Sequence, residues 1–180
     1  MLCPNDGATE LVADTLDRVA VHDCPSCGGI WFERDELRRA KDNADEWIRW
    51  VDTDVFAAAQ ASGDAASSKK CAACGEPMRM IRYPDSDVQI DVCVADHGVW
   101  LDKGEFEKII GELDKMTNSL SAADYEKATA EQFKEIFEPH ESRRSEIKDF
   151  FTAFRLLETR LGTEHPTIAA AINAAARVGF

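Results

Sequence analysis

The 180-residue sequence has no long apolar segment. No stretch approaches the roughly 18 to 20 apolar residues that span a bilayer. The opening MLCPNDG also lacks the basic and apolar regions of a secretory leader. Hydrophobic residues make up 44% of the chain and charged residues 31%, which is typical of globular proteins. We therefore expect a cytoplasmic protein without a membrane partner.

Basic residues are also scarce. The chain has 21 Lys and Arg against 34 Asp and Glu, and its formal net charge is -13. Nucleic acids are held largely by Lys and Arg side chains that neutralise phosphates, so this balance disfavours them. A zinc ion bound by three thiolates would add a further negative charge at its site. We expect a protein partner and keep nucleic acid as the alternative; oligomeric state is not evident from the sequence.

Signatures of common enzymes are missing as well. The sequence contains no G-x-S-x-G element, no P-loop and no glycine pattern for dinucleotides. Zinc-dependent base deaminases need a glutamate in an H-x-E setting, and HDCPSC at residues 22–27 does not provide it. We expect a non-catalytic protein with no catalytic residues. A zinc-dependent enzyme and a thiolate redox sensor are weaker alternatives.

What the sequence does contain is a duplicated cysteine pattern, CPND with CPSCGGIW and later CAAC with CVADHGVW. In a reducing compartment, cysteines at C-x-x-C spacing indicate metal or redox chemistry rather than disulfides. The copies align at offsets of 68 or 69 residues, pairing Cys3 with Cys71, Cys24 with Cys93, and Trp31 with Trp100. The repeat predicts two tandem units of the same fold.

Each unit supplies three cysteines to a predicted zinc site. The first site consists of Cys3, Cys24 and Cys27, and Asp6 stands where the second cysteine of the opening turn would be. Zinc prefers four sulfur, nitrogen or carboxylate ligands in a tetrahedron, so we expect Asp6 to be the fourth ligand. The alternative is that Asp6 only stabilises its own turn.

The second site consists of Cys71, Cys74 and Cys93, with Asp96 or His97 as the fourth ligand. We prefer His97 because imidazole is the softer ligand. The glycines also favour it. A glycine follows Asp6, Cys27, Cys74 and His97, as expected if the residue after the second ligand needs a positive φ.

These sites predict a cofactor content of two zinc ions per chain. Each unit spans only some 40 residues, too few for a sufficient core, whereas a structural zinc contributes about 10 to 16 kcal/mol of binding free energy to folding. We therefore expect Cys24→Ser to unfold the first unit and to leave the second nearly intact.

The remaining pattern predicts an α+β fold in which each zinc ribbon, a small β-hairpin, is followed by a helix. Val88, Ile90 and Val92 alternate as in a strand, and apolar residues from Leu37 to Val55 indicate one long helix. We expect a first ribbon with its helix at residues 1–60, a flexible linker at 61–70, a second ribbon with its helix at 71–118 and a helical region at 119–180.

The helical C-terminal region has its own signals. Ser121 with Asp124 is typical of a helix start. Pro139 should end that helix, and Gly162 should end the next. The stripe of Phe150, Phe154, Leu157 and Leu161 is interpreted as a core seam, with an oligomer interface as the alternative. A final segment near Pro166 carries Ile168, Ile172 and Ala175.

The stretches CPSCGGIWFERDEL and CVADHGVWLDKGEF resemble the bacterial TFIIB-type zinc-finger family, over residues 1–40 and 69–111. The resemblance implies a zinc-ribbon fold, zinc ligation at the positions named above and a link to transcription regulation. The sequence departs from the family pattern at Asp6, where cysteine is commoner, and in CVADH, where the pattern has CPxC. The C-terminal helices lie outside the resemblance.

Overall fold

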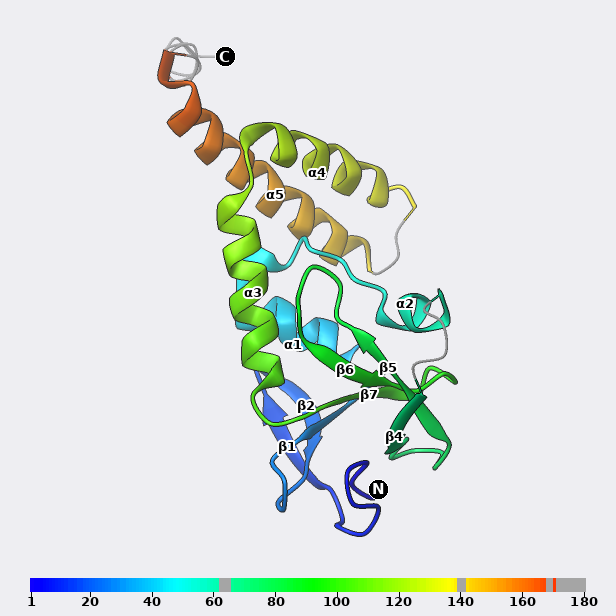
Figure 1. The fold of residues 1–180 in the computed structure, drawn as a ribbon. Coiled ribbons are helices and arrows are strands. Elements are labelled where there is room, and N and C mark those ends of the chain that lie inside the picture. Colours follow the sequence, from blue (N-terminus) through cyan, green and yellow to red (C-terminus); the bar gives the residue numbers. More distant parts are fainter. Residues whose placement is uncertain (62–65, 139–141, 168–169, 171–180) are drawn as a thin grey trace. The chain divides into compact units, whose positions relative to one another are not determined.

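The computed structural model describes residues 1–61, 66–138, 142–167 and 170. The chain forms two compact units, residues 1–116 and 117–180. The first carries a seven-stranded sheet with its helices, and the second carries α4 (Ala122–Glu135) and α5 (Arg143–Glu164) (Figure 1). This confirms the predicted α+β class with a helical C-terminal region. Across the described ranges, no helix is both long and apolar enough to cross a membrane.

The sheet is antiparallel and joins both repeats. Its strands follow the spatial order β1-β2-β3-β7-β6-β5-β4. Their bounds are β1 Val12–Leu16, β2 Val19–Asp23, β3 Ile30–Glu33, β4 Ala66–Lys70, β5 Pro77–Arg82, β6 Gln89–Val92 and β7 Gly98–Leu101. Strands β1 to β3 of the first repeat correspond to β5 to β7 of the second, so the order is palindromic around the β3–β7 pair.

The β3–β7 pair is the centre of this symmetry. Trp31 lies directly opposite Trp100, and Phe32 lies opposite Val99. Cross-strand neighbours of this kind pack against each other on one face of the sheet. The two ribbons therefore form one continuous structure rather than two independently folded units.

Neighbouring residues of the central strands face two different apolar clusters. Phe32, Val99 and Leu101 belong to a large core that also includes helix residues such as Leu37 and Ile109. Trp31 and Trp100, one position away, belong to a smaller cluster that includes four of the cysteines. The alternation of a strand thus places the main core on one face of the sheet and the cysteines on the other.

The predicted long helix after the first ribbon is wrong. The segment is divided into α1 (Glu36–Ala44), the short 3₁₀ helix η1 (Glu46–Ile48) and α2 (Val55–Ala61). The backbone of Asp45 is extended, and its carboxylate caps η1 by accepting from the N–H of Trp47. The buried Lys41 ammonium stabilises the interruption between α1 and α2. It donates to the carbonyls of Ile48, Arg49 and Val51 at 3.2, 2.9 and 2.8 Å.

Carboxylate contacts mark the helix starts that follow the two tryptophans. The N–H of Asp102 donates to Glu105 at 2.7 Å, and the N–H of Glu33 donates to Glu36 at 2.8 Å. Such a return bond satisfies one of the free N–H groups near a helix start. Helix α3 (Glu105–Ser119) follows the second ribbon and ends one residue after the predicted boundary at residue 118.

The interval predicted as a linker, residues 61–70, does not have one uniform structure. Residue 61 ends α2, residues 62–65 lie outside the described part, and Ala66–Lys70 form β4. Strand β4 pairs with β5 and extends the sheet on the side of the second repeat.

The second unit contains two antiparallel helices, α4 (Ala122–Glu135) and α5 (Arg143–Glu164), which pack side by side (Figure 1). The predicted start of α4 is confirmed, because Ser121 and Asp124 form a reciprocal capping box. Helix α4 ends at Glu135, before the proposed break at Pro139, which lies outside the described residues.

Two predictions about α5 are wrong. The helix continues through Gly162 to Glu164. The stripe of Phe150, Phe154, Leu157 and Leu161 is exposed or half-buried, so it is not a buried core seam. In the predicted final segment, Ile168, Ile172 and Ala175 lie outside the described residues.

Candidate metal centres

Three of the four half-sites are tight turns closed by a glycine. In the turns that begin at Cys3, Cys24 and Cys71, the N–H four residues later donates to the cysteine carbonyl, at 2.8, 2.9 and 2.9 Å. The donors are glycines with positive φ: Gly7 (66°), Gly28 (71°) and Gly75 (76°). The conformation expected at these three glycines is confirmed, and it bends the backbone so that side chains of one turn face a common point.

The fourth half-site, Cys93 to His97, closes differently. The N–H of Asp96 donates to the Cys93 carbonyl at 3.1 Å, and Asp96 itself takes the positive φ of 58°. Gly98 is not among the positive-φ residues, so the conformational reason for preferring His97 was wrong. Gly98 is needed for space instead, since a Cβ there would lie 2.2 Å from the Phe32 carbonyl oxygen.

The structure brings His97 together with the three thiols of the second site. The potential ligand atoms of Cys71, Cys74, Cys93 and His97 all lie within 4.8 Å of one another. The Cys74 and Cys93 sulfurs are 3.9 Å apart, and His97 Nδ1 is 3.4 Å from the Cys93 sulfur. Tetrahedral zinc with its usual bond lengths requires about 3.8 Å between sulfurs and about 3.6 Å between sulfur and nitrogen. The second site therefore has the donor set and the dimensions of a closed zinc site.

Asp96, the alternative ligand, faces a different partner. Its Oδ2 lies 3.6 Å from the Arg34 guanidinium. Because Arg34 precedes α1 in the first repeat, this contact links the two repeats rather than contributing to the group of four.

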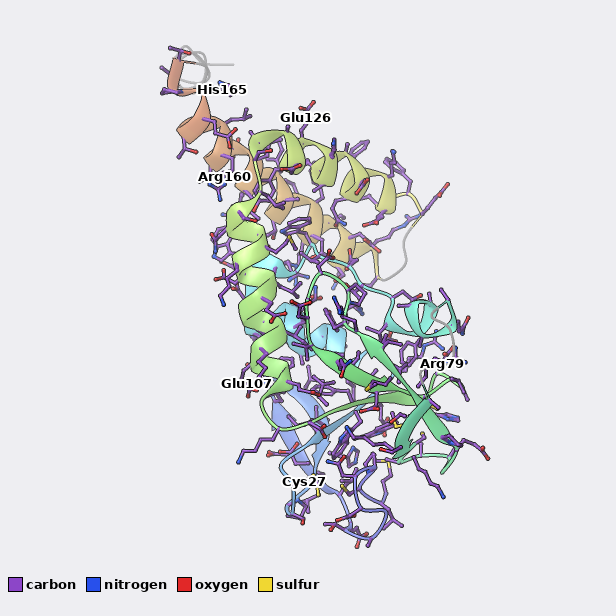
Figure 2. The ribbon with its side chains drawn as sticks, in the orientation of Figure 1. Cys27, Arg79, Glu107, Glu126, Arg160 and His165 are labelled. Atoms are coloured by element: carbon purple, nitrogen blue, oxygen red, sulfur yellow. The ribbon has the colours of Figure 1, made fainter. Side chains whose placement is uncertain are left out.

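The first site brings together three thiols. The potential ligand atoms of Cys3, Cys24 and Cys27 lie within 4.8 Å of one another, and the sulfurs of Cys3 and Cys27 are 3.8 Å apart. That separation again matches the edge of a zinc–sulfur tetrahedron. Figure 2 marks Cys27 in the first ribbon. The group of three doesn't include Asp6.

Asp6 occupies the position of a second ligand but is engaged within its own turn. Its Oδ1 accepts from the N–H groups of Ala8 and Thr9, both at 2.9 Å, and its Oδ2 accepts from the Thr9 hydroxyl at 2.6 Å. These bonds, with the Thr9 hydroxyl as the largest influence, lower the pKa of Asp6 to about 2. Asp6 is therefore a carboxylate at neutral pH, and its ligation remains a prediction.

The environment of the thiols differs within each site. Burial raises the pKa of Cys3 and of Cys71 to about 12. The pKa of Cys24 is lowered although burial opposes this, because the N–H groups of Cys27 and Ser26 donate toward its sulfur. A hydrogen bond from the Glu76 backbone is the largest influence that lowers the pKa of Cys74. Zinc binds thiolates, so binding at Cys3 and Cys71 must displace protons that burial otherwise retains.

Trp31 and Trp100 are fully buried, and each packs against the other repeat. A Cβ at Gly29 would lie 2.2 Å from the Trp100 ring, and a Cβ at Gly98 would lie 2.6 Å from the Trp31 ring. Each indole thus packs on the glycine of the other repeat. Each ring therefore packs beside the cysteines and also fills a space in the opposite ribbon.

A polar bridge also connects the first site with the second ribbon. The Asn5 amide donates to the Cys27 sulfur at 3.4 Å and to Asp102 Oδ1 at 3.0 Å. Asp102 also accepts from the Trp100 indole N–H at 2.9 Å and from the Lys69 ammonium at 2.8 Å. No spacing in the sequence indicates this bridge, since its members are separated by up to 97 positions and follow no periodic pattern.

Comparison with known families agrees with this geometry. The family model described as "Transcription factor zinc-finger", a zinc ribbon of the TFIIB type, matches residues 2–43 and 70–115. The chain carries two tandem zinc-ribbon domains of this family. Both zinc ribbons contain their cysteine group within the matched residues, and the two groups fit two zinc ions. No curated protein and no solved structure matches the chain.

Proposed function

We propose that the chain is a non-catalytic interaction module of transcription regulation, in which two structural zinc ions support a surface for a protein partner. The closed set of Cys71, Cys74, Cys93 and His97 is the main support, because four protein ligands fill a tetrahedral zinc and leave no position for a substrate or water. When bound, zinc would supply cross-links between the turns of each ribbon.

The residues around the sites support a structural role. Trp31 and Trp100 bury the protein side of the two sites, and the sheet hydrogen bonds leave the ribbons little freedom to open. The Asn5 amide and backbone N–H groups face the sulfurs, and such donors stabilise thiolates in metal sites.

Nucleic acid is the second candidate, because the matching family is described as a transcription factor zinc finger. The net charge of -13 argues against it, since phosphate binding requires a local excess of Lys and Arg.

A single set of measurements distinguishes these functions. The zinc-loaded full chain is immobilised on a resin and incubated with an extract of the cells that produce it, with and without nuclease. The zinc-stripped chain serves as the control. The proposal expects a defined protein partner that nuclease does not remove and that the stripped chain does not retain. If the partner were recovered only with intact nucleic acid, or if fluorescent duplex DNA bound at low salt and was released by added salt, the second candidate would be preferred. Elemental analysis should give about two zinc ions per chain.

A further inference from the structure

Helix α5 carries a row of large apolar side chains on its surface. Ile147, Phe150, Phe151 and Phe154 follow the spacing i, i+3, i+4 and i+7, which places them on one face of the helix. Ile147 is 41% exposed, Phe151 58% and Phe154 39%. A face of this kind in water is typical of a surface that binds another molecule.

Helix α4 and the turn that follows it extend the same surface. Phe133 is 52% exposed and Phe137 is 68% exposed, and their ring centroids are 5.4 Å apart. The Phe133 ring lies 5.8 Å from Phe150, which in turn lies 5.4 Å from Phe151 and 6.1 Å from Phe154. We call the continuous surface formed by these two helices the aromatic patch; it consists of Phe133, Phe137, Ile147, Phe150, Phe151 and Phe154.

Apart from the Phe133–Phe150 contact, the aromatic patch lies outside the buried positions of the two helices. The buried positions of α4 are mostly small or polar, namely Ala122, Tyr125, Ala128 and Gln132. In α5, the buried apolar residue is Ala153. Five large apolar side chains of this unit, Phe133, Phe137, Ile147, Phe151 and Phe154, are therefore exposed, although folding of a helix pair normally buries such residues.

The exposed charges beside the aromatic patch on the first turns of α5 are positive, whereas Glu138 next to Phe137 and Glu158 one turn beyond Phe154 are exposed acids at its margins. In residues 142–157 the exposed charged side chains are all basic: Arg143, Arg144, Lys148 and Arg155. The two acidic side chains of this stretch, Glu146 and Asp149, are buried. Arg144, Lys148, Phe151 and Arg155 follow the spacing i, i+4, i+7 and i+11, so the basic side chains share one row with an aromatic ring. Residues 142–157 of the α5 surface are therefore basic within a chain whose net charge is -13.

We propose that the aromatic patch binds an acidic amphipathic helix of a partner protein, which rests on the proposed function as a protein-binding module. Apolar side chains of the ligand helix would pack among the phenylalanine rings, and its Asp and Glu side chains would face Arg144, Lys148 and Arg155. This combination is the helix-in-groove mode of recognition with complementary charge.

The size of the basic region favours a short acidic helix over other anions. A nucleic acid or an anionic membrane extends beyond the aromatic patch and meets a chain with an excess of 13 negative charges. A helix of a few turns places its carboxylates only beside the basic row. The phenylalanine rings also contact one another, mostly edge to face or tilted, and therefore do not form a row of separate faces for stacking bases.

The test uses the zinc-loaded full chain and two synthetic fluorescent peptides. Both peptides have leucines at helical spacing; one has glutamates on the flanks and the other has lysines at the same positions. Anisotropy should show the glutamate peptide binding at least about tenfold more tightly, since several complementary charges replace repulsive ones. Phe151→Asp should weaken this binding at least about tenfold. Lys148→Glu combined with Arg155→Glu should reverse the preference toward the lysine peptide.

Controls separate a local effect from a loss of fold. Trp47→Asp changes an exposed aromatic residue of the first unit and should bind the glutamate peptide like the unmodified chain. Each variant should retain its zinc content and its circular dichroism. Equal affinity for the two peptides, or no binding of either, would overturn the proposal.

Other occupants give different results in the same experiment. Binding to phosphatidylserine vesicles in preference to the glutamate peptide would assign the aromatic patch to a membrane. A dimer in sedimentation equilibrium that Phe151→Asp converts to monomer would assign it to a second copy of the chain. If Phe151→Asp retains the partner captured from extract, the proposed function stands and only the aromatic patch is excluded as its binding surface.

Discussion

The two metal sites are built on the same scaffold but differ in their fourth ligand. The second site gathers three thiols and the His97 imidazole, whereas the first gathers three thiols and leaves the Asp6 carboxylate within its own turn. The glycine-closed turns at Cys3 and Cys71 have the same carbonyl hydrogen bond within 0.1 Å, since the distances are 2.8 and 2.9 Å. The comparison teaches that the backbone turn fixes the sulfurs, while one side chain decides how completely the site is closed.

The largest expected effect tests whether the two sites are independent. Cys24→Ser removes a buried ligand of the first site, and the repeat alone predicts that the second ribbon survives. The structure predicts otherwise, because the two ribbons share the β3–β7 strand pair and the tryptophan of each ribbon packs on a glycine of the other. We expect zinc content to fall below one ion per chain and the thermal unfolding transition of the whole first unit to be lost.

The measurement for Cys24→Ser is elemental analysis together with nuclear magnetic resonance spectra of the second ribbon. Cys93→Ser serves as the reciprocal variant and should give the same collapse. A variant that retains one zinc ion and a native spectrum for residues 70–115 would show that the ribbons fold separately.

The next largest effect tests the packing of the Trp100 ring on Gly29 of the other ribbon. Gly29→Ala places a Cβ 2.2 Å from the Trp100 ring, which is buried and has no space to move. Overpacking of a core costs about 1 to 3 kcal/mol, and we expect the upper end of this range in urea unfolding.

The matched control for Gly29→Ala is Gly111→Ala in α3. A Cβ at Gly111 meets nothing within 4 Å, so this change should stabilise the chain by about 0.5 to 1 kcal/mol through helix propensity. Equal effects of the two substitutions would contradict the packing of the indole on the opposite ribbon.

Local features were predictable from the sequence because they depend on short spacings. The cysteine groups, Gly7, Gly28 and Gly75, and the capping box at Ser121 follow from neighbours within a few residues. His97 lies with the three thiols of the second site, but the conformational reason for preferring it was wrong, since the left-handed residue is Asp96.

Features that depend on distant contacts were not predictable. Trp31 and Trp100 gave no sign that each would pack on the other repeat, because no periodic pattern encodes a pairing between strands 69 positions apart. The apolar residues from Leu37 to Val55 fit one helix, yet Lys41 divides the segment by binding three backbone carbonyls. A charged residue at helical spacing looks solvent-exposed until the tertiary structure buries it.

Asp6→Asn tests the difference between the two sites with an intermediate effect. An asparagine keeps an oxygen that can accept from Ala8 and Thr9 but is a poorer zinc ligand. If Asp6 binds the metal, zinc affinity of the first site should fall by about 100-fold or more in a chelator competition, while Thr9→Ala should lower it only about tenfold by loosening the carboxylate. Equal and small effects of both substitutions would assign Asp6 to the turn alone.

The smallest expected effect concerns the bridge between the ribbons. Asn5→Ala removes the amide that joins the Cys27 sulfur to Asp102, while all cysteines remain. Asn43→Ala is the matched control, because its exposed amide donates to the Asp17 carbonyl at 2.8 Å. Both should reduce the free energy of unfolding by about 1 kcal/mol, the usual contribution of one hydrogen bond.

The rate of zinc loss separates the two variants. Only Asn5→Ala should speed zinc loss to a chelator, by about tenfold, because of the two amides only that of Asn5 contacts a ligand sulfur. Similar rates of zinc loss in the two variants would mean that Asn5 contributes only stability, and that the first site doesn't depend on its contact with the second ribbon.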